Sequence, residues 1–160
     1  METLTFIVNR NLEKGTYNLE EVFPCLRDLD VVREIFSRHG VDDIKVEITD
    51  TVKYMRVLEE NGMVLISKDH LKNSDEKIIF LDILHELVHV RQFFESKELY
   101  DKNYEYVDRP TELEAYRLTV KVAREIGMTD KEIREYLEVE WVSKEQLNRL
   151  LSVLKVKHKD

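Results

Sequence analysis

Apolar and polar residues follow two different periods along this chain of 160 residues. Alternation of apolar with polar positions is typical of a half-buried strand, and recurrence every three or four positions is typical of an amphipathic helix. The alternating pattern predicts three strands, at residues 4–8, 44–48 and 63–67. The helical pattern predicts five helices, at residues 19–39, 75–94, 111–126, 130–138 and 144–156. Residues 51–61 fit either a short helix or an extended segment, and the polar residues 95–109 predict a loop. The chain is therefore predicted to be an α+β protein with a small mixed or antiparallel sheet.

Residues at the ends of these segments carry the signals of turns and helix caps. Asn61-Gly62 is a strong turn signal before the third strand, and Gly40 and Gly127 follow two helices as C-terminal caps do. Pro24 is compatible with a helix only near its first turn. Four pairs match a capping box, in which two side chains three positions apart satisfy backbone N–H groups: Asn73 with Glu76, Thr111 with Glu114, Thr129 with Glu132, and Ser143 with Gln146.

Length and charge narrow the class of protein. The length suits one domain over residues 1–160, with residues 129–157 as a C-terminal helical extension. A formal net charge of −8 argues against general binding of nucleic acid or anionic membranes. The last two helices resemble a helix-turn-helix, but residues 130–150 carry four basic and six acidic side chains, which disfavours phosphate contacts. We expect this helix pair to support the rest of the fold or to bind a protein partner.

Other features predict a cytoplasmic protein without a membrane partner. No apolar run approaches the ~20 residues of a membrane span, and the N-terminus lacks a signal pattern. The polar, basic residues 155–160 are expected to fray. The single cysteine, Cys25, excludes an internal disulfide, and its apolar neighbours predict a buried packing thiol. His39 and His70 are expected to be cap or surface residues rather than ligands.

The strongest chemical signal is the pentapeptide His85-Glu86-Leu87-Val88-His89, an H-E-x-x-H pattern. Histidines four positions apart share one face of a helix, where they can bind one Zn²⁺ at about 2.0–2.1 Å per nitrogen. Glu86 between them can act as general base toward a water molecule at the metal. The helix is apolar over most of its circumference, which predicts burial. The alternative is a pair of surface histidines on an amphipathic helix.

Zinc requires a third protein ligand, and Glu112 is the best candidate. The capping box of Thr111 and Glu114 gives Glu114 a structural role at the third helical position. Glu112, at the first position, is then free to face the motif helix. The alternative for Glu112 is an acid that the helix dipole favours in a first turn.

His85-Glu86-Leu87-Val88-His89 followed by Glu112-Leu113-Glu114-Ala115 resembles the gluzincin branch of zinc metallopeptidases, over residues 63–124. The small intracellular members, called the ImmA/IrrE type, are the most similar in size and layout. The resemblance implies a minimal zincin-like domain, with the sheet packed on an active-site helix and C-terminal helices added. It also implies His85, His89 and Glu112 as ligands and Glu86 as general base and acid. Tyr116 departs from the family pattern, because relatives usually carry Asp or Asn there to orient a ligating histidine.

The expected function is a zinc-dependent peptidase that acts on a peptide or protein substrate. We expect the strand at residues 63–67 to form one wall of the substrate groove and to pair with a bound peptide. The residues near enough in sequence to stabilise the oxyanion are Tyr104, Tyr106, Arg109 and Tyr116. An alternative is a non-catalytic zinc-binding module that regulates or binds other proteins. A further alternative is a latent enzyme whose metal is covered by residues 95–109 or by the basic tail.

Overall fold

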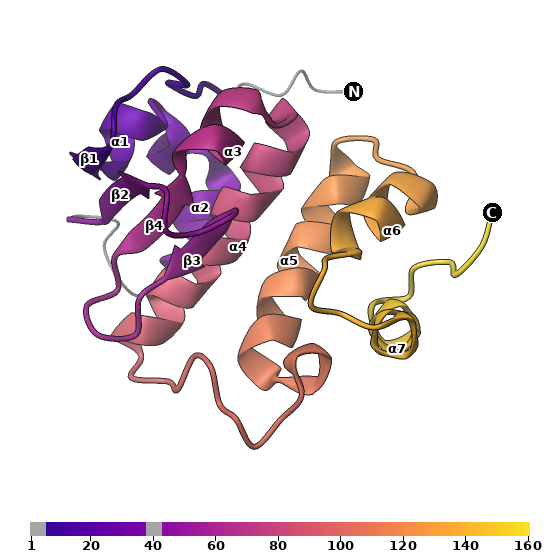
Figure 1. The fold of residues 1–160 in the computed structure, drawn as a ribbon. Helices are drawn as coiled ribbons and strands as arrows, with labels where there is room; N and C mark the ends of the chain where they lie inside the picture. Colours follow the sequence, from indigo (N-terminus) through magenta and orange to yellow (C-terminus); the bar gives the residue numbers. More distant parts are fainter. Residues whose placement is uncertain (1–5, 38–42) are drawn as a thin grey trace.

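A four-stranded sheet and a central helix form one half of the computed structural model, and a group of helices forms the other (Figure 1). The structure describes residues 6–37 and 43–160. The strands are β1 (Gly15–Asn18), β2 (Lys45–Thr49), β3 (Met55–Val57) and β4 (Val64–Ser67), in the order β1-β2-β4-β3. β2 and β4 are parallel, and the two outer strands run antiparallel to their neighbours. The sheet is therefore mixed, which confirms the α+β prediction.

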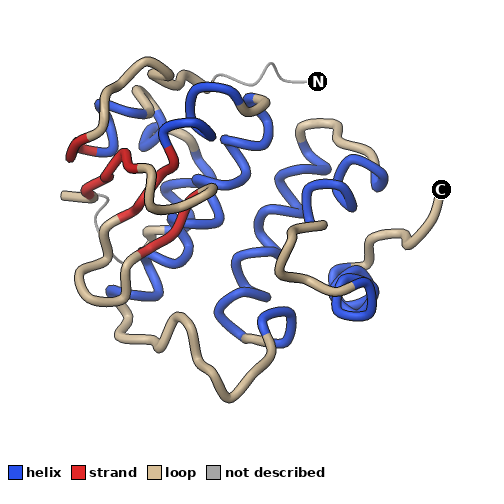
Figure 2. The backbone as a smooth tube through the Cα atoms, viewed as in Figure 1, coloured by secondary structure: helices blue, strands red, loops and turns tan. Residues whose placement is uncertain are grey.

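Helices make up most of the remaining chain. They are α1 (Leu19–Val22), α2 (Asp30–Ile35), α3 (Lys68–Asn73), α4 (Glu76–Phe94), α5 (Pro110–Glu125), α6 (Asp130–Leu137) and α7 (Lys144–Leu154), with short 3-10 turns at Leu26–Asp28 and Tyr106–Asp108. In Figure 2 the strands lie on one side of the molecule and α5, α6 and α7 on the other. None of the helices in residues 6–37 and 43–160 is both long and apolar enough to cross a membrane.

The centre of the fold is α4, which packs against β3, α2 and α5. Twelve of its nineteen side chains are buried, because apolar residues cover most of its circumference. Its apolar faces join the core with residues of the sheet and of α5. The prediction of a buried helix at residues 75–94 is confirmed. Its buried polar side chains consequently have to find partners within the protein.

Two of the predicted strands are confirmed as β2 and β4, and the ambiguous residues 51–61 contain β3. β4 lies between β2 and β3 and all four of its residues are buried. The expectation that a peptide pairs with the strand at residues 63–67 is therefore wrong. β3 is the outer strand on this side of the sheet, so any pairing with a peptide would involve β3.

The predicted N-terminal strand is wrong over its described part. Residues 6–9 are not in a strand, and the start of the predicted segment lies outside the described residues. Phe6 instead packs in the core, with ring centroids 5.7 Å from Phe23 and 4.9 Å from Phe80. The first strand is β1, in a segment where no strand was predicted, and it forms because β2 offers it an antiparallel partner. Tertiary pairing here overrides the local pattern.

The predicted helix at residues 19–39 is broken into α1, a 3-10 turn and α2. The break occurs at Pro24, which lacks an N–H group and disfavours helical geometry in the residue before it. Cys25 follows with a left-handed φ of 68° and is exposed, so the predicted burial of its thiol is wrong. The predicted cap Gly40 and the histidine His39 lie outside the described residues.

Two of the four predicted capping boxes are confirmed, at Thr129 before α6 and at Ser143 before α7. The box at Asn73 is wrong, because Asp75 caps α4 by accepting a hydrogen bond from the Lys77 N–H. The box at Thr111 is also wrong, because α5 begins at Pro110, which makes Arg109 the N-cap and places Thr111 inside the helix. Proline is favoured at a first helical position, where no N–H partner is needed.

The C-terminal tail is held against the helices rather than frayed. Arg124 donates to the Lys155 carbonyl at 2.6 Å, and Arg134 donates to the Lys157 carbonyl at 2.8 Å. Val156 is buried against the core. These contacts direct residues 155–160 along α5 and α6, and none of these six residues lines the cavity that β3, α4, α5 and α6 enclose.

We predict that Gly62→Ala lowers the free energy of unfolding by about 2–4 kcal/mol, because the turn needs a positive φ and the new Cβ would meet a neighbour. Gly62 has a φ of +75°, and a Cβ there would lie 2.6 Å from Cδ1 of Phe93. Urea unfolding measures the loss. Phe93→Leu removes part of the clash, so Gly62→Ala should be less costly in that background. An equal loss in both backgrounds would contradict the clash.

Candidate metal centre

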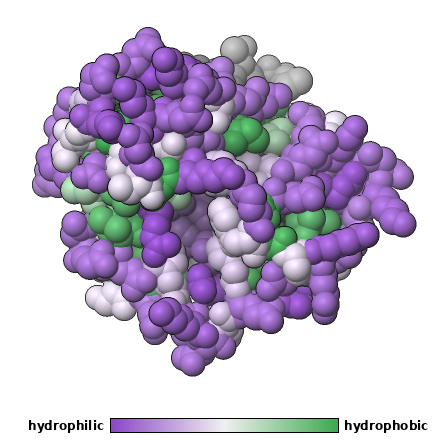
Figure 3. Space-filling view, in the orientation of Figure 1, coloured by the Kyte–Doolittle hydropathy of each residue, from purple (hydrophilic) through white to green (hydrophobic). Residues whose placement is uncertain are grey.

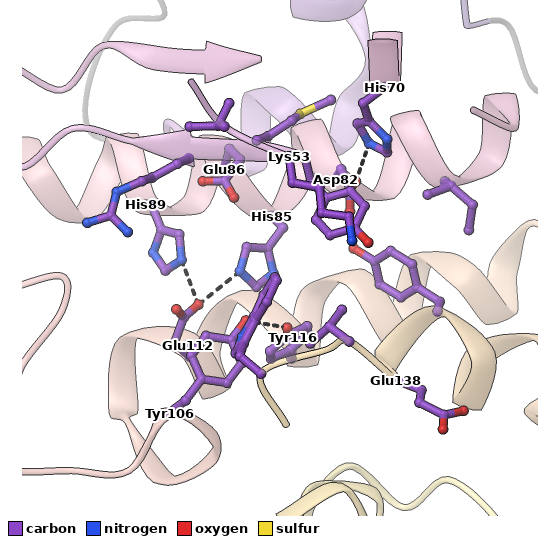
Figure 4. Close-up of a pocket in the computed structure, with 18 of the residues that line it drawn as sticks. Lys53, His70, Asp82, His85, Glu86, His89, Tyr106, Glu112, Tyr116 and Glu138 are labelled. Carbon is purple, nitrogen blue, oxygen red and sulfur yellow. Dashed lines mark hydrogen bonds and ion pairs between the residues drawn. The ribbon is translucent and has the colours of Figure 1, made fainter. Parts of the chain in front are cut away.

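Three side chains predicted as ligands meet between α4 and α5 (Figure 4). His85 and His89 lie one turn apart on α4, with ring centroids 4.8 Å apart. Glu112 reaches them from the first turn of α5: its Oε1 lies 2.9 Å from Nε2 of His85 and 2.8 Å from Nε2 of His89. All three are buried, and their candidate ligand atoms lie within 4.8 Å of one another. The predicted ligands are thus brought together from two helices.

Glu112 lies at another position of its helix than the sequence predicts. Because α5 starts at Pro110, Glu112 occupies the third helical position rather than the first. Thr111 does not cap the helix with its side chain but donates its hydroxyl to the Leu99 carbonyl at 2.6 Å. Glu114 still has a structural role, since it pairs with Arg91 and accepts from Gln92. The start of α5 therefore aims Glu112 at α4.

The cluster favours a positive charge at its centre. Burial alone raises the pKa of Glu112, but the hydrogen bonds with His85 and His89 outweigh it and hold the pKa well below its usual range. Burial lowers the pKa of His89, but the hydrogen bond and charge of Glu112 prevail and raise it to about 9. A buried carboxylate thus faces two imidazole nitrogens, and a cation between them would satisfy all three.

The donor set fits a zinc ion. Two imidazole nitrogens and one carboxylate oxygen are the three protein ligands found in many catalytic zinc sites, which keep a fourth position open. The three atoms converge on one point, because a single oxygen of Glu112 faces both histidines. Among the described residues, Nδ1 of His85 and Oε2 of Glu86 are buried with no hydrogen-bond partner in the protein. Such unpartnered groups are costly unless the site binds a further molecule.

Glu86 lies beside the two histidines on α4 (Figure 4). Its side chain is 8% exposed, and burial raises the pKa of its carboxyl above the usual range. A raised pKa makes a carboxylate a stronger base at neutral pH. The structure thus places the predicted general base next to the predicted ligands, in the same cavity.

A cavity of about 820 Å³ contains this cluster and is lined by residues of β3, α4, α5 and α6. The surface in Figure 3 is hollowed between the two halves of the molecule. Tyr100, from the loop after α4, donates its hydroxyl to the carbonyl of Val57, the last residue of β3, at 2.6 Å. The Arg56 guanidinium lies 4.3 Å from the Tyr100 ring centroid. Part of the predicted loop at residues 95–109 therefore lines the cavity.

Three of the four residues predicted as oxyanion donors line this cavity, namely Tyr106, Arg109 and Tyr116. The fourth, Tyr104, is 46% exposed and lies outside it. The hydroxyls of Tyr106 and Tyr116 form a hydrogen bond of 2.5 Å. The ring centroid of Tyr116 lies 4.5 Å from that of His85. Burial raises the pKa of both tyrosines, so both hydroxyls keep their hydrogens. Tyr116 thus contacts a candidate ligand through its ring.

Sequence reasoning missed Gln92, which contacts the second histidine. Its Oε1 lies 2.7 Å from Nδ1 of His89, and the side chain is fully buried. A signal was present in the sequence: an amide three positions after His89, on a helix predicted to be buried, needs partners inside the protein. The partner on α5 was not visible without the fold.

A second polar cluster lies at the other end of the cavity, and it corrects the expectation that His70 caps a helix or lies on the surface. His70 is buried and forms 2.7 Å contacts with Asp82 through Nε2 and with Ser74 through Nδ1. Tyr136 of α6 donates its hydroxyl to the same Asp82 at 3.0 Å. These bonds join α3, α4 and α6, and they fix α4 one turn before His85.

Side chains from both halves also meet across the cavity, in a group that we call the clasp: Lys53, Tyr54, Glu140 and Trp141. Lys53 pairs with Glu140, and Tyr54 donates to the same carboxylate at 2.6 Å. The Trp141 ring lies 6.1 Å from the Tyr54 ring and 5.8 Å from that of Tyr106. The clasp therefore connects the segment before β3 to the segment between α6 and α7.

Comparisons with known proteins assign no family to this chain. No family model and no solved structure matches it. A stretch of 76 residues is 39% identical to the bromodomain-containing factor 2 of Saccharomyces cerevisiae. That match covers 41% of this chain and 12% of the yeast protein, so the chain spans only a small part of its relative.

We predict that Glu140→Ala opens the clasp and increases acrylamide quenching of Trp141, the only tryptophan of the chain. Tyr54 and Lys53 lose a shared partner, and the indole loses a neighbour that shields it. The melting temperature should hardly change, because exposed ion pairs contribute little to the free energy of unfolding. Asp50→Ala is the control, since it removes an exposed ion pair with Lys14. Equal quenching in both variants would refute the clasp.

Proposed function

We propose that this protein is a zinc-dependent peptidase of the gluzincin type, with His85, His89 and Glu112 as the residues that hold the metal. One observation carries the proposal: the three buried donors converge, and the carboxylate of Glu86, whose Oε2 has no hydrogen-bond partner, lies beside them in the same cavity. The two sequence motifs support the gluzincin type and its small intracellular ImmA/IrrE members. The charges also agree, since a negative Glu112 favours a bound cation.

A zinc ion in such a site acts as a Lewis acid toward a carbonyl oxygen and a water molecule. Glu86 accepts a proton from the water whose oxygen attacks the peptide carbonyl carbon. It then gives that proton to the amine nitrogen as the carbon–nitrogen bond breaks. The products are one carboxylic acid, which keeps the second hydrogen of the water until it ionises, and one amine, and Glu86 returns to its starting state. Burial of Glu86 raises its pKa and so makes both transfers easier at neutral pH.

The hydroxyl pair of Tyr106 and Tyr116 is the best candidate for the oxyanion donor. When one hydroxyl donates to the other, the second keeps a hydrogen that is free for the substrate. Both side chains line the cavity, and the Tyr116 ring contacts His85. Arg109 is a weaker candidate, because its Nη1 lies 3.9 Å from Oε2 of Glu112 and so its charge pairs with a candidate ligand.

The outer edge of β3 offers a place for the substrate backbone. The Tyr54 carbonyl and the Leu58 N–H bond to the β4 side, and backbone groups alternate in direction along a strand. The N–H and C=O groups of Met55 therefore face away from β4. An extended peptide can pair with these groups of Met55. It cannot pair further along with the Val57 carbonyl, because that carbonyl already accepts a hydrogen bond from Tyr100.

A second candidate function is a non-catalytic zinc-binding module that regulates or binds other proteins. The clasp favours it, because the contacts of Lys53 and Tyr54 with Glu140 narrow access to the cavity while they persist. Glu86 favours the enzyme, because a scaffold gains nothing from a buried carboxylate without a partner.

We predict that Glu86→Gln retains zinc and loses hydrolysis, since the amide cannot accept a proton at neutral pH. The rate on a mixed peptide library, measured by mass spectrometry, should fall at least about 100-fold, the usual contribution of a general base. Glu112→Ala is the matched variant from α5, and it should lose most of the zinc as well as the activity. Retained hydrolysis in Glu86→Gln would contradict the mechanism. Zinc binding without hydrolysis in the wild type would favour the module.

A further inference from the structure

The amide of Gln92 has only one orientation that its neighbours allow. Its Nε2 donates to the Thr111 carbonyl at 3.1 Å and to Oε1 of Glu114 at 2.7 Å. A carbonyl and a carboxylate only accept hydrogen bonds, so the NH₂ group must face α5. The oxygen of the amide must consequently face the other way, toward His89.

This orientation determines which nitrogen of His89 carries hydrogen. Oε1 of Gln92 lies 2.7 Å from Nδ1 of His89 and can only accept, so Nδ1 must donate. A neutral imidazole has one N–H group and one lone pair. With the hydrogen on Nδ1, the lone pair is on Nε2, the atom that faces Glu112 at 2.8 Å.

We propose that Gln92 is a positioning residue, which fixes His89 as the Nδ1–H tautomer and turns the Nε2 lone pair toward the metal centre. Glu114 and the Thr111 carbonyl orient Gln92, and Arg91 holds Glu114 through a 2.5 Å ion pair. The inference deepens the proposed function and rests on it for the identity of the metal. It also assigns a role to Glu114, the second acid of the downstream motif.

The other histidine is held differently. Nδ1 of His85 is buried with no hydrogen-bond partner among the described residues, and its ring packs on Tyr116 instead. Tyr116 thus contacts His85 through its aromatic ring, at the position where the resemblance predicts a polar acceptor such as Asp or Asn. The polar residue that orients a candidate ligand is therefore Gln92, which lies on α4 three positions after His89. It contacts His89 and not His85.

Two variants separate positioning from packing. Gln92→Leu fills a similar volume but accepts no hydrogen bond. The double variant Gln92→Glu with Glu114→Gln keeps an acceptor for Nδ1 and reverses the donor–acceptor pair between residues 92 and 114. Both variants lose the bond to the Thr111 carbonyl, so a difference between them reports the bonds that residue 92 makes to His89 and to residue 114.

The zinc dissociation constant, measured by competition with a chelator, should rise by about 10–100-fold in Gln92→Leu and remain within about 3-fold of the wild type in the double variant. The melting temperature of each metal-free protein shows whether it folds. A merely structural role would lower that temperature and leave the zinc affinity of the folded protein unchanged. A folded Gln92→Leu variant with wild-type zinc affinity would therefore overturn the proposal.

A second measurement needs neither metal nor mutation. The ¹⁵N spectrum of the metal-free wild type, recorded at a pH high enough that the imidazoles are neutral, should show a hydrogen on Nδ1 of His89 and none on Nε2. A bare Nδ1 would overturn the proposal even if Gln92→Leu fails to fold. A wild type that binds no zinc would refute the proposed function, and the ¹⁵N spectrum would still decide whether Gln92 fixes the hydrogen.

Discussion

The contact of Glu112 with His85 and His89 is the interaction on which the rest of the arrangement depends. It places one carboxylate from α5 between two imidazoles from α4, in a setting where all three side chains are almost completely buried. Burial of such groups is costly unless they are paired or hold a metal. The apolar packing of α4 against the sheet and against α5 has to supply the free energy that keeps them there.

Polar side chains on α4 are organised in two networks that flank this contact. On one side, His89, Gln92 and Glu114 link α4 to α5. On the other, Asp82 links α4 to α3 through His70 and to α6 through Tyr136. Satisfied networks of this kind rigidify the parts that they join. The helix that presents the histidines is therefore fixed along its length, and the clasp lies over the cavity as the exposed and weaker connection.

Local signals predicted the parts of this structure that local forces determine. The buried helix at residues 75–94 and the strands β2 and β4 follow from periodicity, and the shared helix face of His85 and His89 follows from their spacing. Features that depend on distant partners were missed or wrong. β1 exists because β2 pairs with it, and Gln92 gains its role from a carbonyl and a carboxylate on α5. The prediction of Glu112 as a ligand assumed that the helix starts at Glu112 itself. The helix in fact starts at Pro110, and from the third helical position Glu112 faces the histidines.

In the proposed site one metal ion binds at the point where His85, His89 and Glu112 meet. X-ray absorption at the zinc edge, on protein loaded with one equivalent of zinc, tests it most directly. We expect about four nitrogen and oxygen neighbours at about 2.0–2.1 Å, with outer-shell scattering from two imidazoles. A sulfur neighbour, which would implicate Cys25, or a spectrum without imidazole scattering would contradict it.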